Sequence, residues 1–222
     1  DYAAALASAT ATADAEPALA RELRLFRRRE MVRIAWRDLA GWSDLDETLA
    51  DLTALAETCI QTALDFLYRQ ACQRWGTPTL ADSTPFNIVV LGMGKLGAWE
   101  LNYSSDIDLI FAYAEDGVLN GKKEISYEEF FTRLCRSLVK MLDEMTVDGF
   151  VFRTDVRLRP FGDSGPLIMN FDALPANWKI NVSDEVFNPP TSVMNGEMTA
   201  LEWAESVEAA FAQIRADMAA AK

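Results

Sequence analysis

The chain has 222 residues, half of them hydrophobic and a quarter charged, a composition that supports a sizeable core and excludes disorder throughout. Asp and Glu outnumber Lys and Arg by 34 to 21, which gives a formal net charge of −13. We therefore expect no nucleic acid and no anionic membrane as partners, because affinity for phosphate backbones needs clustered Lys and Arg. The sequence contains no His. This excludes His-dependent catalysis and leaves carboxylates, Lys, Arg, backbone amides and metals.

The three cysteines, Cys59, Cys72 and Cys135, form no Cys-x-x-Cys pair, so neither a zinc motif nor a redox motif is indicated. Cys59 and Cys135 lie in apolar helical patterns and are predicted to be buried thiols. Unpaired thiols favour a reducing compartment, and we expect the cytoplasm. The Ala-rich beginning lacks the basic region of a signal peptide, and no apolar run is long enough to span a bilayer.

Helical patterns dominate the first 80 residues. Residues 1–18 are Ala-rich and predict a frayed helix or an irregular chain end, and Glu16-Pro17 begins a firmer helix. Residues 21–40 of that helix contain seven arginines, which either contact phosphate or pair with acidic neighbours on a solvated face. Ser43-Asp44 predicts the N-cap of a long amphipathic helix that ends near Trp75.

Strands and helices mix after residue 80, which predicts an α+β fold with a mixed sheet and flanking helices. We expect three domains: a helical segment (1–80), a catalytic domain (81–174) and a divergent tail (175–222). The predicted elements are, in chain order, a buried strand (86–91), a strand (106–113), a Gly/Asn turn (117–121), a helix (127–145), a strand (149–159), a short apolar run (167–169) and a last helix (199–221).

A glycine-rich turn follows the first predicted strand. Its residues Gly92, Gly94 and Gly97 fit the pattern Gly-x-Gly-x-x-Gly, with Lys95 inside it. Glycines let a backbone approach phosphate closely, and lysine adds positive charge. The turn alone is equally consistent with a tight strand exit. It also resembles a Rossmann fingerprint with Glu115 or Asp116 as the ribose acid, although a strand rather than a helix comes next.

Three aspartates form the second part of the candidate site. Asp106 and Asp108 are two residues apart at the start of a strand, so their side chains point to one face. Neighbouring carboxylates repel each other unless a cation lies between them, which suits Mg²⁺ or Mn²⁺, although acids at a strand end in water are the alternative. Asp155 is either a third metal ligand or a structural ion-pair partner. Arg157 and Arg159 lie on the same face and could neutralise phosphate oxygens.

The combination resembles the nucleotidyltransferases of the polymerase-β type. Two sequence segments give a more specific resemblance, to the N-terminal, adenylyl-removing half of bacterial glutamine synthetase adenylyltransferases. They are Asn102-Tyr103-Ser104-Ser105-Asp106-Ile107-Asp108 and Phe161-Gly162-Asp163-Ser164-Gly165-Pro166. The resemblance covers about residues 17–174, and the tail departs from it. Further matching segments are 21–29, 75–78, 91–97, 148–153 and 157–160.

This resemblance implies a reaction in which inorganic phosphate removes AMP from an adenylylated tyrosine of glutamine synthetase and gives ADP. It implies that Asp106 and Asp108 bind Mg²⁺ or Mn²⁺, and that Asp155 completes the metal site or orients phosphate. Gly92, Gly94, Lys95 and Ser105 would line the phosphate pocket. A small signalling protein is the implied regulator of the full-length enzyme. The alternative is a non-catalytic module of the same fold that binds nucleotide or a partner protein.

Overall fold

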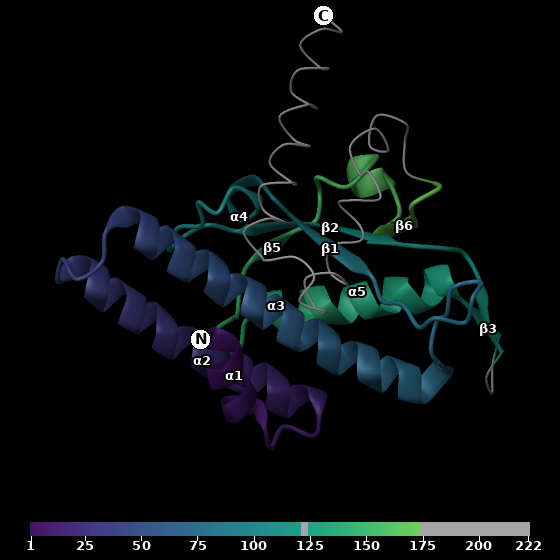
Figure 1. Ribbon diagram of the computed structural model, residues 1–222, viewed down its shortest axis with the longest axis horizontal. Helices are drawn as coiled ribbons and strands as arrows, with labels where there is room; N and C mark the ends of the chain where they lie inside the picture. Colours follow the sequence, from purple (N-terminus) through teal and green to yellow (C-terminus); the bar gives the residue numbers. More distant parts are fainter. Residues whose placement is uncertain (121–123, 174–222) are drawn as a thin grey trace, which may run out of the picture. The chain divides into compact units, whose positions relative to one another are not determined.

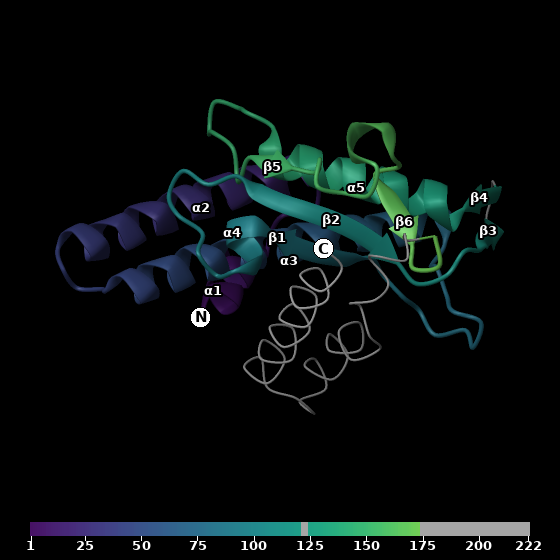
Figure 2. The same ribbon diagram turned by 90° about the horizontal axis from the view of Figure 1, so that it is seen from above.

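Helices, a mixed sheet and a separate two-stranded hairpin make up the part of the protein that the structure describes. A computed structural model describes residues 1–120 and 124–173 (Figures 1 and 2). The predicted last helix, 199–221, lies outside the described residues. Residues 1–170 group into one compact unit, and a second unit begins at Phe171. The prediction of an α+β fold with a mixed sheet is confirmed.

Three helices open the chain: α1 (Tyr2–Thr10), α2 (Glu16–Leu39) and α3 (Leu45–Trp75). The N-cap prediction for α3 is confirmed, because the Asp44 side chain accepts a hydrogen bond from the Glu47 amide at 2.8 Å. Helices α2 and α3 pack side by side as a hairpin (Figure 1). Helix α1 packs against both of them and buries Leu6 completely, so the first residues belong to the core rather than to a frayed end.

Strand β2 (Ile107–Tyr113) is the centre of a four-stranded sheet. It pairs antiparallel with β1 (Val89–Met93) and parallel with β5 (Thr154–Asp155) and β6 (Ile168–Asn170). The connection from β1 to β2 consists of the four-residue helix α4 (Gly94–Gly97) and a loop over residues 98–106. A Rossmann unit needs a crossover helix between parallel strands, so that alternative is wrong.

Helix α5 (Tyr127–Asp143) packs along the sheet and against α3 (Figure 1). Its buried Phe130 and Phe131 stack edge-to-face, with ring centroids 5.1 Å apart, and join a core that reaches from Leu6 to Ile168. Cys59 and Cys135 are buried in this core as predicted, and burial raises the pKa of Cys59 to about 12. Among the described residues, no helix is long and apolar enough to cross a membrane.

Three strand predictions need correction. The first strand begins at Val89 rather than at residue 86 and is half-buried, because it lies at the edge of the described sheet. Residues 118–120 of the predicted Gly/Asn turn (117–121) form a strand, β3 (Val118–Asn120), which pairs antiparallel with β4 (Glu124–Ser126). Of the predicted strand 149–159, only the two residues of β5 are a strand in the structure. The amides of Val151 and Phe152 donate instead to the carbonyl of Leu142, at the end of α5.

Candidate functional site

The backbone of the glycine turn passes close to the side chain of Asp108, one of the predicted site residues. Gly94 follows β1 with a φ of +56°, a left-handed conformation that favours glycine. A Cβ atom at this position would lie 2.7 Å from Oδ2 of Asp108. A Cβ atom at Gly97 would lie 2.3 Å from the carbonyl oxygen of Gly92, so the turn is too tight for a side chain there as well. The backbone of the turn therefore reaches the Asp108 carboxylate.

Asp108 and Asp155 are neighbours across two parallel strands. Their Cα atoms are register partners in the β2–β5 ladder, which directs both side chains to the same side of the sheet. Burial raises the pKa of Asp108, the negative charges of Asp155 and Asp106 raise it further, and Arg157 opposes them. The three predicted acids therefore affect one another electrostatically.

Asp106 is held by an arginine. The side chain of Arg153 donates from Nε to Oδ1 of Asp106 and from Nη2 to the carbonyl oxygen of Ser104. Both side chains of this ion pair are about half exposed, so the pair contributes little to stability. It does orient the Asp106 carboxylate toward Arg153.

Asp155 is also paired with an arginine. Its Oδ1 accepts from the Arg157 amide at 2.8 Å and from Nε of Arg157 at 3.0 Å, and its Oδ2 accepts from Nε at 2.9 Å. These hydrogen bonds, together with the charges of Arg157 and Arg159, lower the pKa of Asp155. Two neighbouring carboxylates thus have pKa values that shift in opposite directions, Asp108 upward and Asp155 downward.

The three acids are a suitable donor set for a hard divalent cation, since all their donor atoms are carboxylate oxygens. Among the described residues, however, no three or more acidic or thiol side chains lie close enough together to hold a metal ion. Arg153 pairs with Oδ1 of Asp106, and Arg157 pairs with both carboxylate oxygens of Asp155.

The other predicted site residues lie around these acids. Lys95 is exposed in α4, next to Gly94. The hydroxyl of Ser105 donates to Oδ1 of Asn102 at 2.8 Å and so shapes the loop that leads to Asp106. Arg159 donates from Nη1 to the carbonyl oxygen of Val156 at 2.6 Å. Trp99 has a φ of +58° at the exit of the turn, a strained conformation for a bulky residue.

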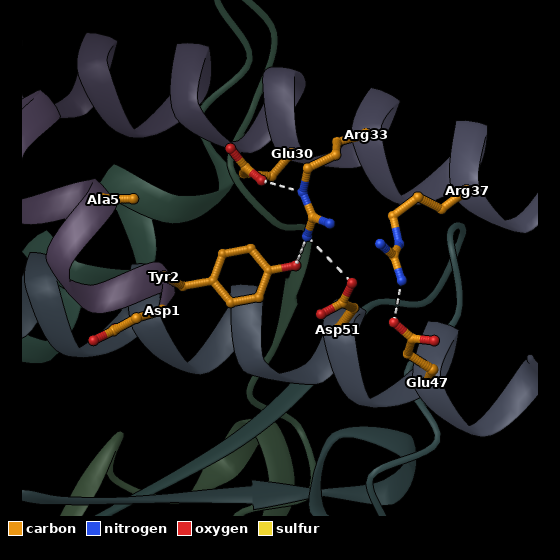
Figure 3. A pocket seen from close by; sticks show the side chains of 8 residues that line it. All are labelled: Asp1, Tyr2, Ala5, Glu30, Arg33, Arg37, Glu47 and Asp51. Atoms are coloured by element: carbon orange, nitrogen blue, oxygen red, sulfur yellow. Dashed lines mark hydrogen bonds and ion pairs between the residues drawn. The ribbon is translucent and has the colours of Figure 1, made fainter. Parts of the chain in front are cut away.

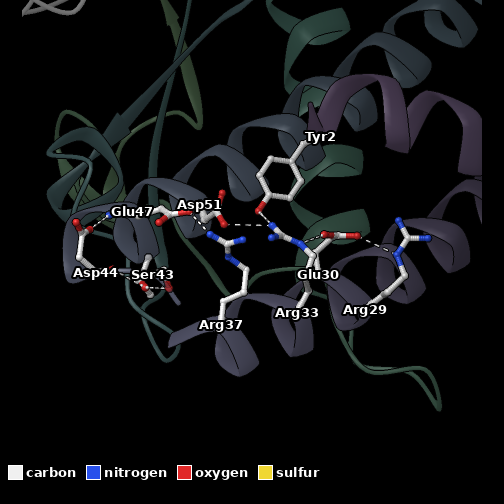
Figure 4. A network of polar contacts seen from close by, with 10 residues as sticks. Tyr2, Arg29, Glu30, Arg33, Arg37, Ser43, Asp44, Glu47 and Asp51 are labelled. Carbon is white, nitrogen blue, oxygen red and sulfur yellow. Dashed lines mark hydrogen bonds and ion pairs between the residues drawn. The ribbon is translucent and has the colours of Figure 1, made fainter. Parts of the chain in front are cut away.

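A second polar site, which the sequence did not predict as a pocket, lies between α1, α2 and α3 (Figure 3). Its cavity measures about 310 Å³, and Arg33 is at its centre. Nε of Arg33 donates to Glu30 at 2.7 Å, and Nη2 donates to Asp51 at 3.2 Å and to the hydroxyl of Tyr2. Arg37 pairs with Glu47 beside it (Figure 4). Here the arginine-rich helix pairs with acidic neighbours, the second of the two alternatives that its sequence left open.

Burial opposes the ionisation of Glu30, but hydrogen bonds from Arg33 and Arg29 outweigh it and lower the pKa of this carboxyl. Every charged group named in this network has a partner within the network. The network therefore links three helices and does not present unpaired charge to a ligand.

The mixed sheet, the glycine turn and the acids on β2 and β5 define a nucleotidyltransferase-like α+β domain. A family model described as glutamate-ammonia ligase adenylyltransferase matches residues 1–181. The chain belongs to this family. The match includes the Ala-rich beginning, which the resemblance had left out, and ends shortly after residue 174.

Two curated relatives are each named bifunctional glutamine synthetase adenylyltransferase/adenylyl-removing enzyme. The protein from Thioalkalivibrio sulfidiphilus is 55% identical over 174 residues, which are 78% of this chain and 18% of the relative. The protein from Methylococcus capsulatus is 54% identical over 166 residues, 75% of this chain and 18% of the relative. The chain thus spans less than a fifth of the length of these relatives.

Proposed function

We propose that this chain is a metal-dependent nucleotidyltransferase domain that removes AMP from an adenylylated tyrosine of glutamine synthetase. The observation that carries the proposal is the meeting of Gly94, Asp108 and Asp155 at the ends of β1, β2 and β5. A backbone turn suited to phosphate adjoins a pair of carboxylates suited to a hard cation. The names of the two relatives supply the protein substrate and the group that is transferred.

The proposed reaction is a phosphorolysis. An oxygen of hydrogen phosphate forms a bond to the adenylyl phosphorus while the bond from that phosphorus to the tyrosine oxygen breaks. The proton of hydrogen phosphate goes to the tyrosine oxygen, so the products are ADP and an unmodified tyrosine. Bound Mg²⁺ or Mn²⁺ would supply positive charge to the attacking and leaving oxygens.

The residues of this chain have distinct proposed roles. Asp106, Asp108 and Asp155 would hold the cation after Arg153 and Arg157 release their carboxylates. Gly92 and Gly94 allow the backbone to approach a phosphate, and the charges of Lys95, Arg157 and Arg159 attract its oxygens. Ser105 shapes the loop before Asp106. The small signalling regulator would act on the full-length enzyme.

The alternative is a module of the same fold that binds nucleotide or a partner protein without catalysis. One observation favours it: both Asp106 and Asp155 are paired with arginines. In this alternative the acids keep these partners and hold no cation.

A calorimetric titration with Mn²⁺ and ADP separates the two functions. We expect the parent chain to bind both, and the double variant Asp106→Asn, Asp108→Asn to lose metal-dependent binding while it keeps its fold. The substitutions change the charge but hardly the shape of the side chains, so thermal unfolding serves as the control. A folded parent chain that binds no Mn²⁺ would contradict the catalytic proposal and leave the binding module.

A further inference from the structure

The strand that carries Asp155 is too short to fix this residue alone. Strand β5 contains two residues, and its ladder with β2 contains two register pairs. The segment that precedes it, 144–152, has anchors outside the sheet. The amides of Val151 and Phe152 donate to the carbonyl of Leu142 at 2.9 and 3.0 Å. The position of Asp155 therefore depends on how this segment is held.

Helix α2 contacts the same segment through two arginines. Nη2 of Arg24 donates to the carbonyl oxygen of Glu144 at 2.8 Å, and only 4% of the Arg24 side chain is exposed. The guanidinium of Arg27 lies over two aromatic rings, 5.1 Å from the centroid of Phe150 and 5.6 Å from that of Phe152. Because Arg24 and Arg27 are three residues apart, they form one row on the helix.

These two arginines are costly if stability is their only role. Nε of Arg24 and Nε of Arg27 are both buried and have no hydrogen-bond partner in the described part of the chain. Burial also lowers the pKa of Arg27. Nη2 of Arg24 also lies 3.8 Å from Oε2 of Glu144, so Arg24 has two partners on this residue. Both arginines therefore direct their contacts to the segment 144–152, at the expense of an unpaired Nε in each.

We infer that Arg24 and Arg27 are positioning residues that hold the segment 144–152, and through it Asp155, beside Asp108. The inference rests on the proposed function, in which Asp155 binds the cation. The connection is direct, since Arg153 and Thr154 follow Phe152 at once. The Arg153 carbonyl accepts from the Ile107 amide at 2.9 Å, and the Thr154 amide donates to Asp143 at 3.2 Å. A shift of Phe150 or Phe152 would disturb both hydrogen bonds.

The test compares Arg24→Met and Arg27→Met with Arg28→Met, which removes the same charge from an exposed position of the same helix. Three quantities are measured in the full chain: the unfolding midpoint, the Mn²⁺ affinity, and the hydrogen exchange of the Ile107 and Thr154 amides. We expect Arg27→Met to keep its midpoint and Arg24→Met to lower it modestly, because the Glu144 carbonyl loses its donor. Both variants should exchange these amides faster and bind Mn²⁺ about 10-fold more weakly, including at temperatures where they are fully folded. Arg28→Met should match the parent chain in all three. Arg24→Lys keeps a donor for the Glu144 carbonyl and should restore most of the affinity.

The outcomes separate this inference from the proposed function. Exchange rates equal to those of the parent in both test variants would overturn it, as would Mn²⁺ affinity equal to that of a parent chain that binds the ion. A fall of affinity that merely follows a lower unfolding midpoint would assign the arginines to stability and also overturn it. If the parent chain binds no Mn²⁺, the proposed metal site fails. The exchange rates then decide whether the arginines hold the Asp155 segment.

Discussion

The Gly94 backbone passes so close to the Asp108 carboxylate that a methyl group there would collide with it. We predict that Gly94→Ala costs about 1–2 kcal/mol in unfolding free energy from its left-handed φ alone, and more from the collision with the carboxylate. The variant should also bind Mn²⁺ more weakly, because Asp108 must move. Urea unfolding and a Mn²⁺ titration measure the two effects.

Gly41→Ala is the matched control for this prediction. Gly41 has a similar φ of +68°, and nothing lies within 4 Å of the Cβ atom that it would acquire. It should show the cost of the backbone conformation and leave Mn²⁺ binding unchanged. If the two alanine variants behave alike in both measurements, the contact between the turn and Asp108 has no role in the site.

The opposite pKa shifts of Asp108 and Asp155 give a second prediction. Arg157 lowers the pKa of both carboxyls, so Arg157→Met should raise both values. In the parent chain, ionised Asp155 stabilises the fold above its ordinary pKa of 3.8, and this contribution is lost as the pH falls through the lower folded-state pKa. The raised pKa of Asp108 has the opposite effect on the pH dependence of stability. The contribution of Asp108 to the unfolding free energy is complete below its ordinary pKa and is lost as the pH rises through the raised folded-state pKa.

Carboxyl carbon NMR titration measures the two pKa values in the parent, in Arg157→Met and in Arg136→Met. Arg136 is an exposed arginine of α5 and provides the charge control. We also expect a weaker loss of stability on the acid side in Arg157→Met, because Asp155 no longer has its principal partner. An unchanged Asp155 titration in Arg157→Met would show that the ion pair does not form in solution.

At the scale of elements, α1 shows how buried contacts outweigh local propensity. It is nine residues long and mostly alanine, a length at which an isolated helix is marginal in water. Leu6 is completely buried nonetheless, and the Tyr2 hydroxyl accepts from Arg33 of α2. The helix is therefore stabilised by α2 and α3, which sequence periodicity alone did not indicate.

We predict that Leu6→Ala lowers the unfolding free energy by about 2–5 kcal/mol, the usual cost of a cavity at a buried leucine. Ala4 is exposed on the same helix and provides the control. Ala4→Ser should change the unfolding free energy by less than about 0.5 kcal/mol. Denaturant unfolding of both variants provides the comparison. A small effect at Leu6 would mean that α1 is detached from the helical hairpin in solution.

Elements with a strong pattern were predictable, and those fixed by distant contacts were not. The period of α3 and its Asp44 cap fixed its start and end, and the apolar run of β2 with its two aspartates predicted the centre of the site. The strand predicted over 149–159 failed because the Val151 and Phe152 amides bond to a helix end and Arg27 covers the two phenylalanines. Alternation in sequence cannot distinguish such a segment from a strand.

The same reason limits the prediction of the site. Spacing placed Asp106 and Asp108 on one face and proposed Asp155 as their neighbour, and the structure pairs Asp108 with Asp155 in the sheet. The ion pairs of Asp106 with Arg153 and of Asp155 with Arg157 depend on side-chain geometry. Arg153 and Arg157 both lie two residues from Asp155 in the sequence. The sequence does not show that Arg157 pairs with Asp155, whereas Arg153 pairs with Asp106.

At the scale of the whole molecule, the net charge of −13 requires that any phosphate site be positive locally. Several arginines of α2 do not serve this purpose, because Arg29, Arg33 and Arg37 pair with acids of α2 and α3. The cations closest in sequence to the glycine turn and to Asp155 are Lys95, Arg153, Arg157 and Arg159. Any attraction for phosphate near the ends of β1 and β5 would come from these cations, of which Arg153 and Arg157 already form ion pairs with Asp106 and Asp155.

The residues around the candidate site predict the direction of the reaction. The names of the relatives combine two activities, and this sequence contains one Gly-x-Gly-x-x-Gly turn, to which we assign one of them. Residues 102–108 and 161–166 resemble the adenylyl-removing half. With adenylylated glutamine synthetase, Mg²⁺ and phosphate, the chain should therefore release ADP. With unmodified synthetase and ATP, it should transfer no AMP.

Asp108→Asn should abolish ADP release without unfolding the chain. Transfer of AMP from ATP without phosphate-dependent ADP release would assign the chain to the opposite half. The absence of both reactions in a chain that binds Mn²⁺ and ADP would identify a binding module that needs the rest of the longer protein for catalysis.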